Sequence, residues 1–359
     1  MNAISLVMAV FSLLAAADRI FGNKLGLGRE FEKGFELFGG LALSMIGMIA
    51  VSPLIAGALE PTLGFFSDVL KIDPSVIPAT LFANDMGGAP LAAEVAVNPE
   101  IGRFNALVVS SMMGATISFT IPCALGAVGE DRRRELLLGL LCGIVTIPVG
   151  SFLGGLVLGV QPGALLWNIL PLALFSGVIA AGLILCPETC VKIFGVFGAF
   201  IRIVVTAGLG LAVFGFLTGK QLIPGLGTLE EGAAICLNAC AVMTGAFPLL
   251  KVLSRILAKP MRRMGEALGV NDASVMGFVS SLANSITTFE MMDSMDRRGA
   301  MLNAAFAVSA AFVLADHLAF TLAFDPGCLP AVTVGKLSAG LLAVLLAAFL
   351  SRKDAKGGN

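Results

Sequence analysis

Long apolar stretches constrain the fold of this 359-residue chain more than any other feature. The hydrocarbon core of a bilayer is about 30 Å thick, so a membrane-spanning helix needs about 20 mostly apolar residues. Nine stretches meet this requirement, near residues 2–21, 35–57, 104–128, 136–158, 165–186, 193–217, 232–257, 300–323 and 330–350. Only 13% of the residues are charged, against about 25% in a soluble domain. We therefore expect an all-α polytopic membrane protein with about nine transmembrane helices.

Two further stretches, 78–97 and 274–292, are long enough to span but contain acids, amides, hydroxyls or glycines at their centres. The positive-inside rule distinguishes the two ways in which they could be placed. If both stretches enter the membrane and return, nearly all cations outside the spans share one face, and the other face keeps only Lys71, Arg103 and Lys220. If both cross, the cations divide almost evenly. The rule therefore favours two re-entrant, broken segments, with the N-terminus outside and the C-terminus in the cytoplasm.

The order of spans repeats along the chain at an offset of about 198 residues, which brings segment 78–97 onto segment 274–292. We expect a first repeat at 1–160, with four spans and the first broken segment. A linking helix at 161–192 would invert a second repeat at 193–359, with four spans and the second broken segment. Inverted repeats of this kind are typical of secondary transporters, whose substrate sites lie at paired, broken helices near the membrane midplane.

The first broken segment contains the strongest candidate for a binding residue. Asp85 follows Asn84 and precedes Gly87 and Gly88, which predict a break in the helix. An ionisable group deep in a membrane costs at least about 2.5 to 3.5 kcal/mol, so it needs a partner or a function. We expect Asp85, with carbonyls freed at the two glycines, to bind a cationic ligand, and Asp85 could also cap the second half of the helix. Glu94 is a second acid in this segment.

The second broken segment offers uncharged polar groups from Asn284, Ser285 and Thr287, followed by Glu290. One anionic half and one neutral half would suit a small ligand that has an ammonium at one end and a hydroxyl at the other. For Glu290 a surface salt bridge is an equal alternative, because charged residues follow it closely.

Other ionisable residues lie in predicted spans, among them Asp316, His317 and Lys336. Asp316 and the single histidine, His317, are adjacent, so on a continuous helix they point about 100° apart. We expect only one of them to face a central cavity. His317 could serve as a packing residue or as a proton relay. Lys336 lies near the start of the last span, and we expect its long side chain to extend toward the membrane surface.

Several function classes are excluded. The net charge of −1 gives no basic surplus for nucleic-acid binding. The chain contains no phosphate-binding loop, no zinc-protease motif and no serine nucleophile elbow. The seven cysteines show no paired spacing of a zinc or disulfide framework. We therefore expect no enzyme activity, no catalytic residues, no cofactor and no metal.

Four stretches carry a resemblance to a known family: Asp85–Gly88, Ser111–Thr116, Gly143–Pro148, and Ala305–Phe312 continuing to Leu318. Over essentially its whole length the chain resembles the ethanolamine permeases of the ethanolamine-utilisation system. The resemblance implies a multi-pass protein of the bacterial inner membrane that carries ethanolamine inward. The expected partners are ethanolamine and the lipid bilayer, and a homo-oligomer is a further option. The alternatives are a channel or transporter for another small polar cation or metabolite, and a receptor or scaffold that does not transport.

Overall fold

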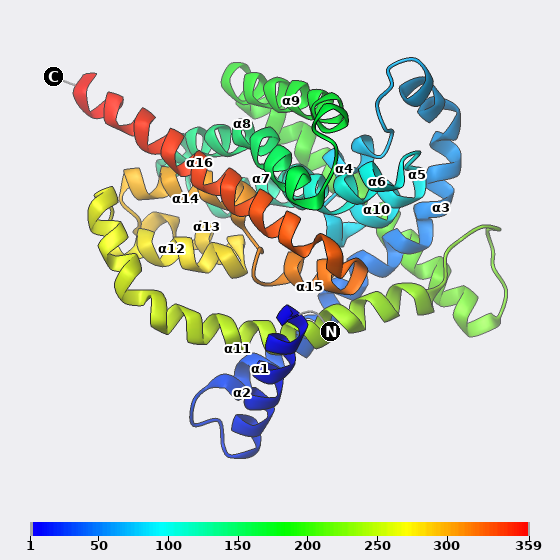
Figure 1. Cartoon of the computed structure of the whole chain (residues 1–359), viewed down its shortest axis with the longest axis horizontal. Helices are drawn as coiled ribbons and strands as arrows, with labels where there is room; N and C mark the ends of the chain where they lie inside the picture. Colours follow the sequence, from blue (N-terminus) through cyan, green and yellow to red (C-terminus); the bar gives the residue numbers. More distant parts are fainter. Residues whose placement is uncertain (1–2, 358–359) are drawn as a thin grey trace.

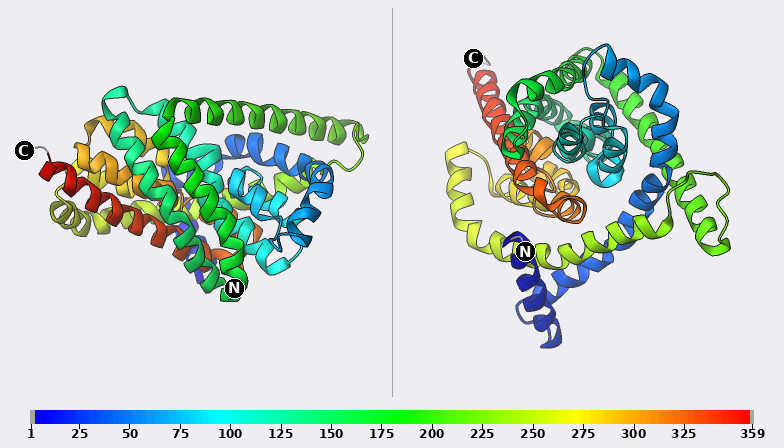
Figure 2. Two further views of the ribbon diagram at one scale, coloured as in Figure 1. Left: turned by 90° about the horizontal axis from the view of Figure 1, so that it is seen from above. Right: turned by 45° about the vertical axis from the view of Figure 1, so that its right-hand side comes forward.

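The computed structural model describes residues 3–357, except for the side chains of residues 3, 60–63, 191, 257–262, 264 and 352–357. Within this part of the chain every regular element is a helix. Long helices such as α11 and α16 run along the outside, and a hairpin of α1 and α2 projects from the side of α11 (Figures 1 and 2). The segment η2 is buried along its whole length and α14 is buried from Gly299 to its end, and the two form the centre of the molecule.

The helices follow the predicted spans and breaks. The first part of the chain forms α1 (Ala3–Ile20), α2 (Leu27–Glu36), α3 (Phe38–Asp68), α4 (Val76–Leu81), η1 (Asn84–Met86), α5 (Gly88–Val95), α6 (Pro99–Arg103), the π-helical segments η2 (Phe104–Gly114) and η3 (Thr116–Thr120), α7 (Ile121–Ala127), η4 (Glu130–Arg132), α8 (Arg133–Leu158) and α9 (Pro162–Leu185). The rest forms α10 (Pro187–Thr218), α11 (Leu229–Leu268), α12 (Asp272–Ala283), α13 (Ser285–Glu290), η5 (Met292–Ser294), α14 (Arg297–Ala310), α15 (Asp316–Phe324), η6 (Pro326–Cys328) and α16 (Leu329–Gly357).

Seven helical stretches in the described part of the chain are long and apolar enough to cross a membrane. They are Leu27–Leu59, Pro99–Ala127, Glu130–Leu158, Pro162–Leu185, Pro187–Thr218, Leu229–Ile256 and Pro326–Ser351. Each overlaps one predicted span, so the expectation of an all-α polytopic membrane protein is confirmed. The first predicted span, whose residue 2 lies outside the described part, corresponds to the shorter helix α1.

The eighth predicted span, 300–323, is not one continuous helix. α14 ends at Ala310 and α15 begins at Asp316. Between them, the backbone N–H groups of Phe312 and Leu314 donate to the carbonyl oxygens of Ser281 and Leu282 at the end of α12, both at 3.0 Å. The prediction was wrong here because these residues take their acceptors from a neighbouring helix instead of from their own.

Both predicted broken segments are interrupted helices, and a polar cluster joins the two ends of each. In the first segment, Asp73 accepts hydrogen bonds from the backbone N–H groups of Ser75, Val97 and Asn98. The amide of the buried Asn105 donates to the Ser75 hydroxyl at 2.8 Å. Asn98 caps α6 through the N–H groups of residues 100 and 101. These bonds hold the start of α4 against the start of α6, so that α4 and α5 form a closed hairpin.

A similar cluster closes the second broken segment. Asn271 caps α12 by accepting from Ser274, and Asp296 caps α14 by accepting from Gly299. Asp296 also accepts from the backbone N–H of Asn271 and from the Ser274 hydroxyl. The amide of the buried Asn303 donates to the Ser274 carbonyl oxygen at 2.9 Å. The start of α12 is thereby fixed to the start of α14, with α13 between them.

Candidate functional site

A cavity of about 200 Å³ lies where the interrupted helices meet. Its lining comes from α3, from the break between α4 and α5, from the η2–η3 region and from the break before α15. The residues that line it are Gly40, Leu41, Ser44, Ala83, Asp85, Met86, Ala115, Phe119, Phe312, Asp316 and His317. Most of this wall is apolar, so the two carboxylates and the imidazole are its principal polar groups.

The break that presents Asp85 depends on backbone geometry. After α4 ends, Phe82 and Ala83 are extended, and Gly87 adopts φ 95°, a left-handed conformation that favours glycine. A Cβ on Gly87 would also collide with the Met48 side chain. The expectation of a free carbonyl at Gly87 is wrong, because this oxygen accepts the first hydrogen bond of α5, from the Leu91 N–H at 3.1 Å.

The break before α15 presents Asp316 and His317. Phe312 adopts φ 62°, which is unusual for a bulky residue. Its ring contacts that of Phe119 at 5.5 Å and that of His317 at 5.2 Å between centroids. Both Asp316 and His317 line the cavity. We expected only one of them to do so, but α15 begins at Asp316, and the two residues lie at the end of a helix that faces the cavity.

Asp85 and His317 lie close together in the lining of the cavity. His317 Nε2 lies 3.9 Å from Asp85 Oδ1, and the two side chains are only 3% and 15% exposed. His317 Nδ1 has no hydrogen-bond partner among the described residues, and neither does either amide atom of the buried Asn84 beside Asp85. The charges of Asp85 and Asp316 are close enough to interact. Two carboxylates in a small, mostly apolar cavity favour a bound cation, because burial of an uncompensated charge is costly.

Lys336 is a buried cation that the sequence reasoning placed elsewhere. Its side chain is 1% exposed, and Nζ donates to the Ser111 carbonyl oxygen at 2.6 Å. The expectation that it reaches the membrane surface is wrong. A Cβ on the neighbouring Gly335 would lie only 3.1 Å from the Gly150 carbonyl oxygen of α8. α16 is therefore packed closely against α8, with this stretch of it turned into the protein. A lysine inside an apolar span was the available signal.

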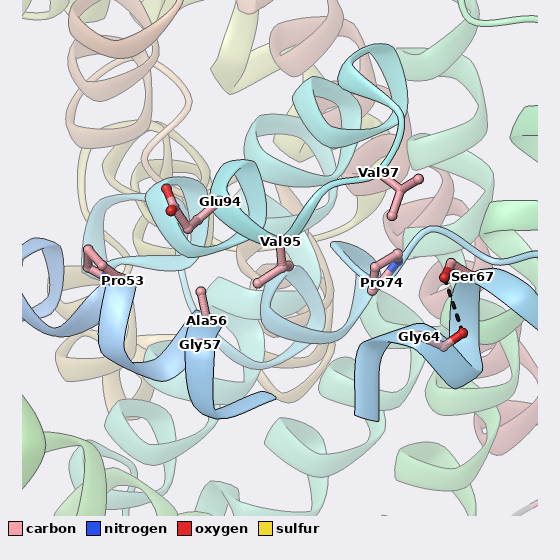
Figure 3. A pocket seen from close by; sticks show the side chains of 9 residues that line it. All are labelled: Pro53, Ala56, Gly57, Gly64, Ser67, Pro74, Glu94, Val95 and Val97. Carbon is pink, nitrogen blue, oxygen red and sulfur yellow. Dashed lines mark hydrogen bonds between the residues drawn. The ribbon is translucent and has the colours of Figure 1, made fainter. Parts of the chain in front are cut away.

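Glu94 does not line the cavity. It lies in a separate pocket of about 430 Å³, between α3 and α5. Figure 3 shows Glu94 and Val95 of α5 across this pocket from Ala56 and Gly57 of α3. Glu94 and Asp85 thus line different pockets, although both belong to the same broken segment.

The predicted residues of the second broken segment also lie outside the cavity. The Asn284 side chain accepts from the Ile286 N–H at 2.8 Å and caps α13. Ser285 is buried, and its hydroxyl has no partner among the described residues. Thr287 lines a third pocket, of about 440 Å³, with Lys251 and Ser254 of α11. Glu290 is exposed. The structure thus brings Asp85, Asp316 and His317 together and leaves these four residues elsewhere.

Within residues 3–357, no group of three or more His, Cys, Asp or Glu side chains is arranged to hold a metal ion. The chemistry available in the cavity is therefore that of two carboxylates and one imidazole. These groups can hold a cation, accept hydrogen bonds and exchange a proton.

Comparison with known proteins assigns the chain to a family. Residues 1–350 match the family model "Ethanolamine utilisation protein, EutH". A probable ethanolamine permease EutH of Listeria monocytogenes is 42% identical over 350 residues, which covers 98% of this chain and 94% of that protein. One of the same name from Salmonella typhimurium is 38% identical over 386 residues, covering 97% and 95%. The uncharacterized protein YxeR of Bacillus subtilis is 36% identical over 350 residues, covering 98% and 95%. No solved structure matches. The chain belongs to the EutH family of ethanolamine utilisation proteins.

Proposed function

We propose that this protein is a permease that carries ethanolamine across the bacterial inner membrane, with no chemical step of its own. The observation on which this proposal rests is the cavity that holds Asp85, Asp316 and His317 inside a bundle of membrane-spanning helices. The names of the Listeria and Salmonella relatives support the same substrate.

The size and charge of the cavity suit ethanolamine. Pockets for drug-sized ligands measure about 300 to 1,000 Å³, so a cavity of about 200 Å³ favours a molecule of few atoms. The amine of ethanolamine, like a lysine ammonium, is protonated at neutral pH. This charge is costly to bring into hydrocarbon. The carboxylates of Asp85 and Asp316 replace the water around the ammonium and reduce that cost.

The hydroxyl of ethanolamine needs a separate partner. His317 lines the cavity beside Asp85, so its imidazole can bond the hydroxyl while Asp85 holds the ammonium. The Ser44 hydroxyl, which donates to the Leu41 carbonyl oxygen at 3.1 Å, keeps its acceptor lone pairs free. In this arrangement Asn284, Ser285 and Thr287 would contact the substrate along its exit path and not in the cavity.

The two clusters that close the broken segments support inverted repeats at 1–160 and 193–359, joined by the linking helix at 161–192. Asp73 and Asn271, Asn98 and Asp296, and Asn105 and Asn303 are each 198 residues apart. In each cluster a backbone-to-side-chain hydrogen bond joins the first two residues, and the third residue donates its amide to a serine close to the first. Three coinciding pairs with one offset are difficult to explain by the periodicity of helices and loops alone.

The same offset relates the pocket that contains Glu94 and the pocket that contains Thr287. Pro53 and Ala56 of the pocket with Glu94 lie 198 residues before Lys251 and Ser254 of the pocket with Thr287. We assign the first pocket to the outer approach to the cavity and the second to the inner approach. Glu94 would then attract cations at the entrance, and each hairpin would separate one approach from the cavity.

The N-terminus is assigned to the outside and the C-terminus to the cytoplasm, on the positive-inside rule. Cysteines introduced one at a time at residues 132–134 and 262–263, in a variant without native cysteines, should label from the same face of the membrane. Labelling from opposite faces would contradict this topology.

Counterflow of labelled ethanolamine in proteoliposomes tests the function. A carrier takes up label faster when unlabelled ethanolamine is present inside, because exchange avoids the return of the empty protein. A channel gives conductance without this acceleration, and a receptor or scaffold gives neither. Acceleration by internal ethanolamine would support the permease, and its absence from well-inserted protein would refute it.

A further inference from the structure

The membrane-embedded lysine that the proposed binding site does not use is Lys336 on α16. It is 1% exposed and is among the largest fully buried side chains of the protein. Its Nζ donates a hydrogen bond to the Ser111 carbonyl oxygen at 2.6 Å. No carboxylate of the described residues lies within 4 Å of it. A buried ammonium with one neutral partner is expensive, so its charge needs compensation from a group farther away.

The surroundings of Ser111 show where that compensation comes from. Ser111 lies in the π-helical segment η2, and in a helix the carbonyl of residue 111 points toward the turn that contains residues 115 and 116. Ala115 in that turn lines the cavity with Asp85. The ammonium of Lys336 therefore lies behind this wall of the cavity.

Charges on the two sides of this wall interact. Lys336 interacts electrostatically with both Asp85 and His317. Asp316 lies on the opposite break but in the same cavity, and its charge interacts with Asp85. The empty site thus contains two carboxylates, one imidazole and one fixed amine behind the wall.

We propose that Lys336 is an internal counter-cation for the acidic cavity, with which the ammonium of the substrate competes. The inference rests on the proposed function and adds a residue that sets affinity. In the empty protein, Lys336 stabilises the carboxylate of Asp85 without filling the cavity. When ethanolamine enters, two cations share the same carboxylates, so binding weakens and release becomes faster. Such a residue keeps a permease from holding its substrate too tightly.

Replacing Lys336 by methionine removes the charge and keeps a long, flexible side chain. We expect the half-saturating concentration of ethanolamine in counterflow to fall about tenfold. This is the size expected from removing a like charge near a ligand at an effective dielectric constant of about 20. The maximal exchange rate should fall as well, because release slows. Lys336→Arg keeps the charge and should retain a half-saturating concentration close to that of the unmodified protein.

The matched control is Lys220→Met, the same change on the exposed loop after α10. It should leave both parameters unchanged. If Lys336 only anchored α16 to η2, its loss would lower the maximal rate and leave affinity unchanged or weaker, and Lys336→Met would not tighten binding. An unchanged or raised half-saturating concentration in well-inserted Lys336→Met would therefore overturn the inference.

A second variant covers the case in which Lys336→Met fails to insert. The double variant Asp85→Asn/Lys336→Met removes one charge of each sign, so it leaves the net charge of the site unchanged. It should bind ethanolamine more tightly than Asp85→Asn alone. Equal or weaker binding, or failure of the double variant to insert, would assign Lys336 a structural role and overturn the inference. Absence of counterflow in the unmodified protein would instead refute the permease function itself.

Discussion

Removal of the Asp85 charge is the most direct perturbation of the proposed site. Asp85→Asn keeps the size and shape of the side chain, so the cavity of about 200 Å³ should persist. The Asp85 side chain is 15% exposed, so water screens its interaction with a ligand only weakly. The variant replaces a carboxylate that accepts from an ammonium by an amide that offers one neutral oxygen.

The expected loss follows from the strength of one such interaction. A hydrogen bond to a charged group contributes about 1.5 to 3 kcal/mol, and about 1.4 kcal/mol corresponds to a factor of ten. The half-saturating concentration of ethanolamine should therefore rise about tenfold to one-hundredfold. Binding should not vanish, because Asp316 remains in the cavity.

Counterflow in proteoliposomes at a series of ethanolamine concentrations measures this change. Asp293→Asn, the same substitution on an exposed residue after α13, is the matched control and should behave like the unmodified protein. Competition by ethylene glycol gives a second measurement. This molecule has no ammonium, so its affinity for Asp85→Asn should equal its affinity for the unmodified protein. If Asp85→Asn is well inserted and its half-saturating concentration is unchanged, the ammonium does not bind at Asp85. Asp316 would then be the next residue to test.

Two further predictions concern the scaffold around the site. Gly114→Ala should prevent correct packing or lower the free energy of unfolding by about 1–3 kcal/mol, because the new Cβ would collide with the Phe82 carbonyl oxygen. Gly126→Ala, which meets no described atom within 4 Å, should be tolerated, and thermal unfolding in detergent compares the two. Burial alone would raise the pKa of Asp325, but the hydrogen bonds it accepts, chiefly from Arg103 Nε at 2.6 Å, hold that pKa below its ordinary value of 3.8. The stability from this pair is therefore present above pH 3.8 and lost as the pH falls through the lowered pKa. Asp325→Asn should unfold more readily than the unmodified protein near neutral pH, by at most about 1 kcal/mol, and the difference should close in acid; a difference that grows in acid would contradict this assignment.

Membrane insertion and the main helices could be predicted from the sequence because they depend on local composition. A stretch of about 20 apolar residues is favourable in hydrocarbon wherever it lies in the chain. The breaks at Gly87 and Asn284 could be recognised for a similar reason, since glycine and polar residues interrupt an apolar run locally. Asp85, Asp316 and His317 could also be selected as candidates, because an ionisable group in a membrane span is costly and therefore rare.

Tertiary structure alone decided how these pieces meet. The break before Asp316 passes through Ala311, Phe312 and Leu314, which are compatible with a helix, and it forms because α12 offers two free carbonyl oxygens to this segment. The burial of Lys336 depends on how closely α16 packs against α8, which no local pattern specifies. Membership of one broken segment likewise did not bring Glu94 to Asp85: Asp85 lies in the turn before α5, whereas Glu94 lies near the far end of α5 and lines another pocket. Local hydropathy determines which residues enter the membrane, whereas contacts between distant helices determine which of them share a cavity.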